Sequence, residues 1–214
     1  MSLDTEITMP IFIEVIKNYF NENEINIIME VGGLDCYDSL YFKSIYPKAE
    51  VYCIEGLPDN YEKYIKNLTI IKHYNIIIND FDGKVNYHQK NINGIHSIFD
   101  RGSDYGTNIL TNQKCLTLKT FCKRKNIKNI DMIKIDVEGA SYNVLKGMGD
   151  ILKTIKIIHI ESESYPFFKG QKLHNEVCDF LINNNFTLIK LSEVYIYDTN
   201  KQYDSIWINN SFLK

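Results

Sequence analysis

Charged residues gather at the end of one predicted buried strand, where they could carry acid–base chemistry. Residues 131–138 read Asp-Met-Ile-Lys-Ile-Asp-Val-Glu, so Lys134, Asp136 and Glu138 alternate along the chain. Alternating residues of a strand point to one face, and buried charges are costly unless they are paired or used. Asp136 and Glu138 are therefore candidate general bases, and an ion pair that merely orders the strand end is the structural alternative.

A second acidic group follows in residues 159–163, which read His-Ile-Glu-Ser-Glu. Glu161 is the third candidate base, because it would lie beside Asp136 if the two strands are neighbours in a parallel sheet. A single histidine in a strand is usually a core residue, so we expect His159 to be structural. His96 and Ser97, from a long loop, rank behind Glu161 as candidates.

A glycine turn after an earlier predicted strand could bind a ligand. Residues 30–36 read Glu-Val-Gly-Gly-Leu-Asp-Cys, and Gly32 and Gly33 would let the backbone turn sharply and approach a ligand closely. Glu30 and Asp35 place negative charge beside the turn, which suits a cationic ligand better than a pyrophosphate. The alternative is a tight turn that binds nothing.

Glu55 ends the next predicted strand, 25 residues after Glu30. A carboxylate at that position can accept hydrogen bonds from both hydroxyls of a ribose. The carboxyl ends of parallel strands meet in one crevice, so Glu55 and the glycine turn together predict a nucleoside ligand. An exposed acid at a strand end is the structural alternative.

Short β-branched runs alternate with amphipathic stretches, which predicts an α/β fold with a mainly parallel, doubly wound sheet. Helices are expected at 9–22, 38–46, 59–66 (with Asp59 as N-cap), 118–125, 141–148 and 172–183, and strands at 25–31, 50–55, 69–78, 84–89, 131–136, 155–161, 186–191 and 203–209. The turn at 79–83 predicts a hairpin that pairs 84–89 with 69–78. Residues 198–201 are too few for a helical crossover, so the last two strands should form an antiparallel hairpin.

We expect one domain over residues 1–214, with a helical lead-in at 1–24 and a loop at 90–113 that covers the site. Loop 90–113 and the aromatic stretch 165–168 are expected to shape the pocket of the second substrate. Nothing in the sequence specifies an oligomeric state.

Composition excludes several classes of protein. The 214 residues carry a net charge of −3, so the basic excess of a nucleic-acid binder is missing. The five cysteines include no CxxC pair, which predicts reduced thiols in a cytoplasmic protein rather than a disulfide framework or a zinc site. No signal peptide is evident, and no apolar run approaches the ~20 residues of a membrane span.

The stretch around the acidic strand end resembles the FkbM-type methyltransferases. The resemblance rests on Lys-Ile-Asp-Val-Glu-Gly at 134–139, with Asp131 before it, Val-Leu-Lys-Gly at 144–147 after it, and Leu-Thr-Leu-Lys-Thr-Phe at 116–121. It covers about residues 27–163. It implies a Rossmann-like methyltransferase fold, S-adenosylmethionine as cofactor, and a hydroxyl of a sugar, glycan or secondary metabolite as acceptor.

The resemblance also implies positions for the cofactor. The residues that match the family's cofactor site are Glu30, Gly32, Gly33, Asp35, Glu55 (for the ribose) and Asn75 (near the adenine). Two positions depart from the family's pattern. Cys36 stands where a glycine is common and could crowd the turn, and Lys119 stands where the family tends to have an acid.

The expected reaction is in-line transfer of a methyl group to an oxygen, aided by Asp136, Glu138 or Glu161 as general base. We expect no metal ion, although carboxylates could hold one. An NAD-dependent Rossmann oxidoreductase is the first alternative, but the turn lacks a third glycine. A non-catalytic domain that binds S-adenosylmethionine is the second. A nucleic-acid methyltransferase is not expected, because no Asn/Asp-Pro-Pro-Tyr-like motif is present.

Overall fold

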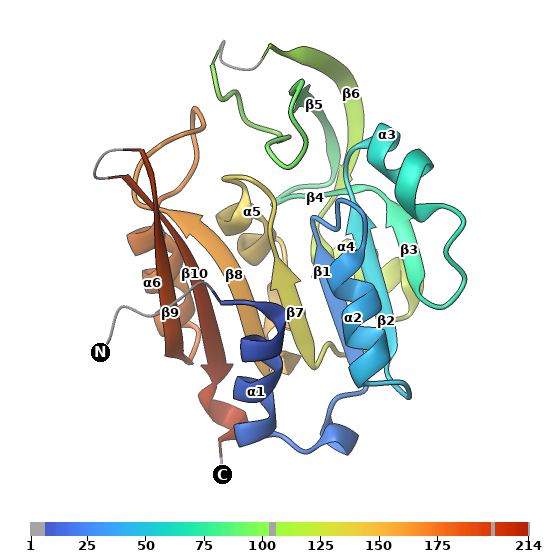
Figure 1. The fold of residues 1–214 in the computed structure, drawn as a ribbon, viewed down its shortest axis with the longest axis vertical. Coiled ribbons are helices and arrows are strands. Elements are labelled where there is room, and N and C mark those ends of the chain that lie inside the picture. Colours follow the sequence, from blue (N-terminus) through green and yellow to red (C-terminus); the bar gives the residue numbers. More distant parts are fainter. Residues whose placement is uncertain (1–6, 103–105, 198–199, 214) are drawn as a thin grey trace.

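A seven-stranded sheet organises the computed structural model, which describes residues 7–102, 106–197 and 200–213 (Figure 1). The strand order is β3-β2-β1-β7-β8-β10-β9. The bounds are Ile27–Val31 for β1, Glu50–Glu55 for β2, Lys72–Asn75 for β3, Met132–Ile135 for β7, Ile157–Glu163 for β8, Phe186–Tyr197 for β9 and Asn200–Asn209 for β10. The first five strands of this order are parallel, and β10 pairs antiparallel with β8 and with β9. The predicted α/β class, the parallel sheet and the terminal hairpin are confirmed.

The sheet has one topological switch point. The chain runs outward from β1 through β2 to β3, then returns to β7 on the other side of β1 and continues to β8. Ligands of open α/β sheets bind in the crevice outside the carboxyl ends of the strands at such a point. The fold therefore places the ligand site above β1 and β7.

Helices cover both faces of the sheet (Figure 1). Their bounds are Met9–Tyr19 for α1, Tyr37–Ile45 for α2, Pro58–Asn60 for α3 with a π-helical turn at Tyr61–Ile65, Leu118–Lys125 for α4, Ser141–Lys146 for α5 and His174–Asn183 for α6, and short 3-10 turns lie at Glu22–Glu24, Gly149–Thr154 and Asn210–Phe212. Adjacent residues of β1 alternate between the two hydrophobic clusters. Ile28 packs with Phe12 and Phe42 of α1 and α2, and Met29 packs with Phe121 of α4 on the opposite face.

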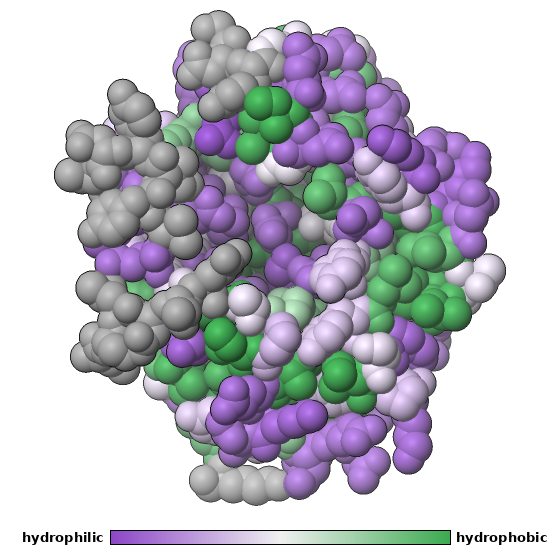
Figure 2. All heavy atoms as spheres, viewed as in Figure 1, coloured by the Kyte–Doolittle hydropathy of each residue, from purple (hydrophilic) through white to green (hydrophobic). Residues whose placement is uncertain are grey.

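The face that bears α1 and α2 is polar around its centre. In the space-filling view, hydrophilic residues surround a hollow above these two helices (Figure 2). Among the described residues, no helix is long and apolar enough to cross a membrane.

A second, three-stranded sheet stands over the carboxyl edge of the first (Figure 1). Its order is β4-β6-β5, with β4 at Ile77–Ile78, β5 at Gly83–Gln89 and β6 at Asn108–Leu116. The predicted hairpin is wrong: β5 pairs antiparallel with β6, and the predicted strand 69–78 divides into β3 and β4, which belong to different sheets. The expected loop 90–113 likewise contains residues 108–113 of the nine-residue strand β6. That strand escaped prediction because most of its residues are polar and exposed, so it shows no apolar alternation.

Two local predictions also need correction. The expected N-cap Asp59 lies inside helix α3, which starts at Pro58 with Leu57 as its N-cap. Proline suits the first turn of a helix, where its missing N–H would have no intrahelical partner. The first helix ends at Tyr19, three residues before the predicted end.

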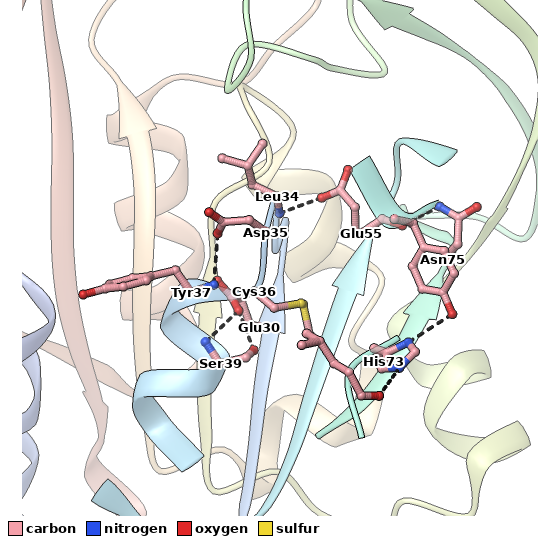
Figure 3. Close-up of a disulfide and its surroundings, with 12 residues drawn as sticks. Glu30, Leu34, Asp35, Cys36, Tyr37, Ser39, Glu55, His73 and Asn75 are labelled. Atoms are coloured by element: carbon pink, nitrogen blue, oxygen red, sulfur yellow. Dashed lines mark hydrogen bonds between the residues drawn. A yellow bond between two sulfur atoms is a disulfide. The ribbon is translucent and has the colours of Figure 1, made fainter. Parts of the chain in front are cut away.

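The expectation that all cysteines are reduced is wrong for two of them. Cys36 and Cys53 form a disulfide (Figure 3), and Cys115, Cys122 and Cys178 are free. The two partners are 17 residues apart and form no recognisable motif. They meet because β1 and β2 are neighbours: Cys53 pairs with Glu30 in register, and the chain after Gly33 turns back over β2.

Candidate functional site

A cavity of about 170 Å³ lies at the switch point, between the carboxyl edge of the main sheet and the small sheet. The edge of the main sheet contributes Gly32, Leu34, Glu55, Asp136, Glu138 and Glu161. The opposite wall comes from Tyr87 of β5 and from Gly94, His96 and Ile98 in the segment between β5 and β6. The lining therefore includes all three candidate bases and two of the six predicted cofactor residues.

Both glycines of the turn are required by close packing. Gly32 has φ +90°, and a Cβ there would lie 1.6 Å from the carbonyl oxygen of Asp136. A Cβ on Gly33 would lie 2.2 Å from Sγ of Cys53. Gly32 thus brings the end of β1 against the end of β7 at the cavity wall, whereas Gly33 makes room for the disulfide beneath the turn.

Cys36 does not crowd the turn. It adopts the left-handed conformation, with φ +59°, as the N-cap of α2, which is a conformation that glycine adopts most easily. Its sulfur points down toward β2 and bonds Cys53 (Figure 3). The disulfide thus holds a residue other than glycine in a conformation that the turn requires.

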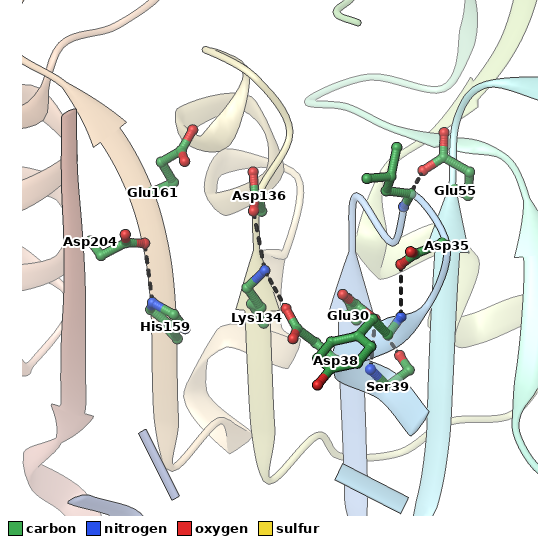
Figure 4. A network of polar contacts seen from close by, with 12 residues as sticks. Glu30, Asp35, Asp38, Ser39, Glu55, Lys134, Asp136, His159, Glu161 and Asp204 are labelled. Atoms are coloured by element: carbon green, nitrogen blue, oxygen red, sulfur yellow. Dashed lines mark hydrogen bonds and ion pairs between the residues drawn. The ribbon is translucent and has the colours of Figure 1, made fainter. Parts of the chain in front are cut away.

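Glu30 and Asp35 do not line the cavity. The Glu30 carboxylate is 2% exposed and accepts hydrogen bonds from the backbone N–H (3.0 Å) and the hydroxyl of Ser39 in α2. Burial raises the pKa of Glu30 to about 8. Asp35 accepts a bond from the N–H of Tyr37 at 3.0 Å. Glu30 therefore fixes the start of α2 to β1, and Asp35 fixes it to the turn between them (Figure 4).

Glu55 lies at the cavity wall, as a ribose-binding acid must. Its two carboxylate oxygens accept hydrogen bonds from the N–H groups of Leu57 (2.7 Å) and Leu34 (2.8 Å). Burial raises its pKa to about 7. Asn75 does not reach the cavity, and its side chain donates instead to the backbone carbonyl of Glu55 at 2.9 Å.

An apolar wall beside Glu55 was missed by sequence reasoning. Ile76, Ile77 and Ile78 line the cavity where β3 passes into β4. Such a wall suits a flat aromatic base. The three isoleucines looked like any buried strand, so their residue types gave no functional signal.

Lys134 forms an ion pair at the end of β7, as expected if this lysine is structural rather than catalytic. Its Nζ lies 2.7 Å from Oδ2 of Asp38 and 3.1 Å from Oδ2 of Asp136 (Figure 4). Burial alone would lower the pKa of Lys134, but the charges of Asp136, Glu30 and Asp38 outweigh it and raise that pKa well above its ordinary value. Lys134 thus acts structurally, and it holds Asp136 in place.

The three candidate bases come together. One carboxylate oxygen from each of Asp136, Glu138 and Glu161 lies within 4.8 Å of the others. β7 ends at Ile135, and Glu138 reaches the group from a turn in which its φ is +52°. The prediction that Glu161 neighbours Asp136 depended on the pairing of β7 with β8, and that pairing is present.

Glu138 and Glu161 are acids whose surroundings disfavour the charged form. Burial, reinforced by the charge of Asp136, raises the pKa of both glutamates well above the ordinary value. Glu161 also accepts a hydrogen bond from the side-chain amide of Gln202. Three clustered carboxylates could hold a divalent cation, but the raised pKa values mean that protons compete for the same oxygens.

The segment between β5 and β6 is tied to the acidic group. The Ser97 hydroxyl donates to the carbonyl of Glu138 at 2.6 Å, and Nη1 of Arg101 lies 3.8 Å from Oε2 of Glu138. His96 Nδ1 accepts from the N–H of Lys90 at 3.0 Å. These contacts place Gly94, His96 and Ile98 over the cavity, while residues 103–105 lie outside the described part of the chain.

Comparison with known proteins agrees with this geometry. The family model for the methyltransferase FkbM domain matches residues 13–188, so the chain belongs to the FkbM methyltransferase family. A curated relative, the 2-O-methyltransferase NoeI of Sinorhizobium fredii (strain NBRC 101917 / NGR234), is 23% identical over 171 residues, which cover 72% of this chain and 70% of NoeI.

Solved structures show the same fold. TrmK of M. capricolum, in complex with S-adenosylhomocysteine, superposes with a TM-score of 0.52 at 16% identity, covering 96% of this chain and 69% of that chain. An uncharacterised protein from Listeria monocytogenes serotype 4b superposes with a TM-score of 0.50 at 10% identity, covering 97% of this chain and 69% of that chain.

The family and the fold identify an S-adenosylmethionine-dependent methyltransferase with a Rossmann-like architecture. The family assignment sets aside the oxidoreductase alternative.

Proposed function

We propose that this protein transfers the methyl group of S-adenosylmethionine to a hydroxyl oxygen of a saccharide or a related small molecule. The proposal rests mainly on one arrangement: a cavity at the switch point with Glu55 and an apolar wall at one end and Asp136, Glu138 and Glu161 at the other. A curated relative named as a 2-O-methyltransferase supports a hydroxyl acceptor.

The residues present fit the proposed cofactor. The backbone of Gly32 lines the cavity without a side chain, Glu55 offers a carboxylate to the ribose hydroxyls, and Ile76 to Ile78 offer an apolar wall to the adenine. The carboxylates at the other end suit a sulfonium cation. In this proposal Glu30, Gly33, Asp35 and Asn75 shape the turn and the end of β2 without touching the cofactor.

The cofactor supplies an activated methyl group, and the chain supplies alignment and proton transfer. Alignment of two reactants can lower a barrier by about 7–11 kcal/mol, and a general base contributes typically about 10²- to 10⁴-fold. We propose Glu161 as the base: burial raises its pKa, and Glu138, whose pKa is raised as well, is paired with Arg101. Asp136, held by Lys134 at 3.1 Å, places a second carboxyl group beside the proposed donor.

Methyl transfer to a saccharide panel tests the proposal. The purified chain is incubated with methyl-labelled S-adenosylmethionine and a panel of mono- and oligosaccharides, and labelled products are analysed by mass spectrometry. We expect label in a hydroxyl-linked methyl group, and its loss in Glu161→Gln. Tight cofactor binding without transfer to any acceptor would instead favour a non-catalytic domain.

A single domain, a small-molecule rather than nucleic-acid acceptor, and a cytoplasmic location belong to the same proposal. The acidic site supports a small-molecule acceptor, because it would repel the phosphate backbone of a nucleic acid. A disulfide is unusual for a cytoplasmic protein, since reducing compartments keep most thiols free. Alkylation of free thiols at the moment of cell lysis would show whether Cys36 and Cys53 are bonded in the cell.

A further inference from the structure

A second cavity, of about 460 Å³, opens beside the first on the face that carries α1 and α2. Its walls come from the start of α1, the first turn of α2, and the strands β7, β8 and β10, through residues that include Thr8, Tyr37, Tyr41, His159, Gln202 and Asp204. It opens onto the face seen in Figure 2, where hydrophilic residues gather around the hollow.

We propose that this second cavity binds the methyl acceptor, and that the acceptor is an uncharged or amine-bearing saccharide rather than a phosphorylated one. The inference rests on the proposed function and adds the place and the charge class of the acceptor.

The position of the cavity is the first argument. Asp136 and Glu161 line both cavities, and they are the only described residues that do so. Reacting atoms must approach to about 3–3.5 Å for in-line attack. A donor bound in the first cavity can therefore be reached from the second across the shared wall, where the proposed base Glu161 stands.

The charge of the walls is the second argument. Asp38, Asp136 and Asp204 line the second cavity, and the lysine there, Lys134, is already paired with the first two at 2.7 and 3.1 Å. Nε2 of His159 lies 3.2 Å from Oδ1 of Asp204, so that nitrogen already faces a carboxylate. A phosphate would meet carboxylates without an unpaired cation among the described lining residues, whereas an ammonium group would be attracted.

An exposed tyrosine in the lining of this cavity is the third argument. Tyr37 is 69% exposed at the start of α2, and Tyr41 lies one turn later on the same side of the helix. Such exposure is not needed for core packing, since Tyr37 belongs to neither hydrophobic cluster. A tyrosine ring offers an apolar face to the C–H groups of a sugar and a hydroxyl for hydrogen bonds.

The cavity differs from the expected acceptor pocket. Residues 165–168 line neither cavity. Phe168 is buried, and its ring lies against Gly139, where an added Cβ would come 2.6 Å from it. Arg101 stacks over Phe167 and Phe168, with centroid distances of 5.6 and 5.1 Å. These aromatic residues anchor the segment above the first cavity instead.

Saturation-transfer NMR on the protein loaded with S-adenosylhomocysteine tests the proposal. The probes are D-glucose, D-galactose, D-glucosamine and D-glucose 6-phosphate, each at millimolar concentration. We expect signals from the neutral and amino sugars and a signal at least about fivefold weaker from the phosphate. Tyr37→Ala should lower the sugar signals at least about fivefold, and Tyr165→Ala, an exposed aromatic that lines neither cavity, should leave them unchanged.

Three results of the NMR experiment would overturn the proposal: no signal from any neutral or amino sugar, a strongest signal from the phosphate, or signals that Tyr37→Ala leaves unchanged. Calorimetry with S-adenosylhomocysteine accompanies each variant. A tenfold loss of its affinity in Tyr37→Ala would mean that the second cavity holds part of the cofactor, which also overturns the proposal. Failure of the wild-type chain to bind S-adenosylhomocysteine would refute the proposed function itself and is thus a distinct outcome.

Discussion

The disulfide between Cys36 and Cys53 makes a quantitative prediction about stability. It closes a loop with a sequence separation of 17. The chain-entropy estimate for a loop of that length is about 3 kcal/mol of stabilisation. For a domain of this size, loss of the bond should lower the unfolding temperature by roughly 6–12 °C.

The same bond should affect the cofactor site, because it holds the turn in its binding conformation. A residue other than glycine in the left-handed region costs roughly 1–2 kcal/mol, and the disulfide fixes Cys36 there. Without the bond, the turn must be ordered when the cofactor binds. We expect the affinity for S-adenosylhomocysteine to fall about five- to tenfold, which corresponds to about 1 kcal/mol.

The perturbation is the double variant Cys36→Ser with Cys53→Ser, compared with the wild-type chain before and after reduction. Urea denaturation and calorimetry measure the two effects, and Cys178→Ser, at a free cysteine of α6, is the matched control. Thiol titration of the denatured, unreduced chain should find three thiols, since two of the five cysteines are bonded. Five thiols before reduction, or an unchanged midpoint after it, would refute the reasoning.

Other predictions concern the acids and the glycine turn. Glu161→Gln should lower kcat by about 10²- to 10⁴-fold with little change in cofactor affinity, and wild-type kcat should rise with pH through the raised pKa of Glu161; a variant with wild-type kcat would exclude this base. Burial raises the pKa of Glu30 from 4.5 to about 8, so between these pH values the folded state holds a proton that the unfolded state has lost. The free energy of unfolding of the wild type should therefore fall by up to about 5 kcal/mol as pH rises across that window. Glu30→Gln should lack this loss, which denaturation at about pH 5 and about pH 9 would measure; equal losses in both proteins would contradict the assignment. Gly32→Ala should lower the free energy of unfolding by more than about 3 kcal/mol, because its Cβ would strike the Asp136 carbonyl. The control Gly94→Ala, with positive φ but no neighbour within 4 Å, should lower it by only roughly 1–2 kcal/mol. Similar losses in the two variants would show that contact with β7 is unimportant.

Much of the main sheet could be predicted because its strands and helices carry strong local signals. Strand 50–55 and helix 118–125 have the predicted bounds, the latter with Thr117 accepting a bond from Thr120 as N-cap. β6 could not be found in this way, because a polar, half-exposed strand of a small sheet has no hydrophobic period.

The site was predicted in outline but not in detail. The ends of β1, β2, β7 and β8 were expected to meet at one crevice, and Gly32, Glu55, Asp136, Glu138 and Glu161 line one cavity there. Glu30 was expected at the ligand, but it is buried against Ser39 at the start of α2. That contact depends on tertiary packing, which local sequence patterns do not reveal. The disulfide and the second cavity were equally hidden, since both depend on which strands become neighbours.

Calorimetric titration of the wild-type chain and Glu55→Gln with S-adenosylhomocysteine tests the central claim most directly, namely that the cavity at the end of β1 and β2 binds this cofactor. Glu50→Gln, at the exposed start of the same strand, is the control, and the unfolding temperature of each variant checks the fold. We predict binding to the wild type and the control, at least tenfold weaker binding to Glu55→Gln, and affinity that rises with pH as Glu55, with a pKa of about 7, loses its proton. No binding to the wild type at millimolar ligand, or equal binding to Glu55→Gln, would contradict the account.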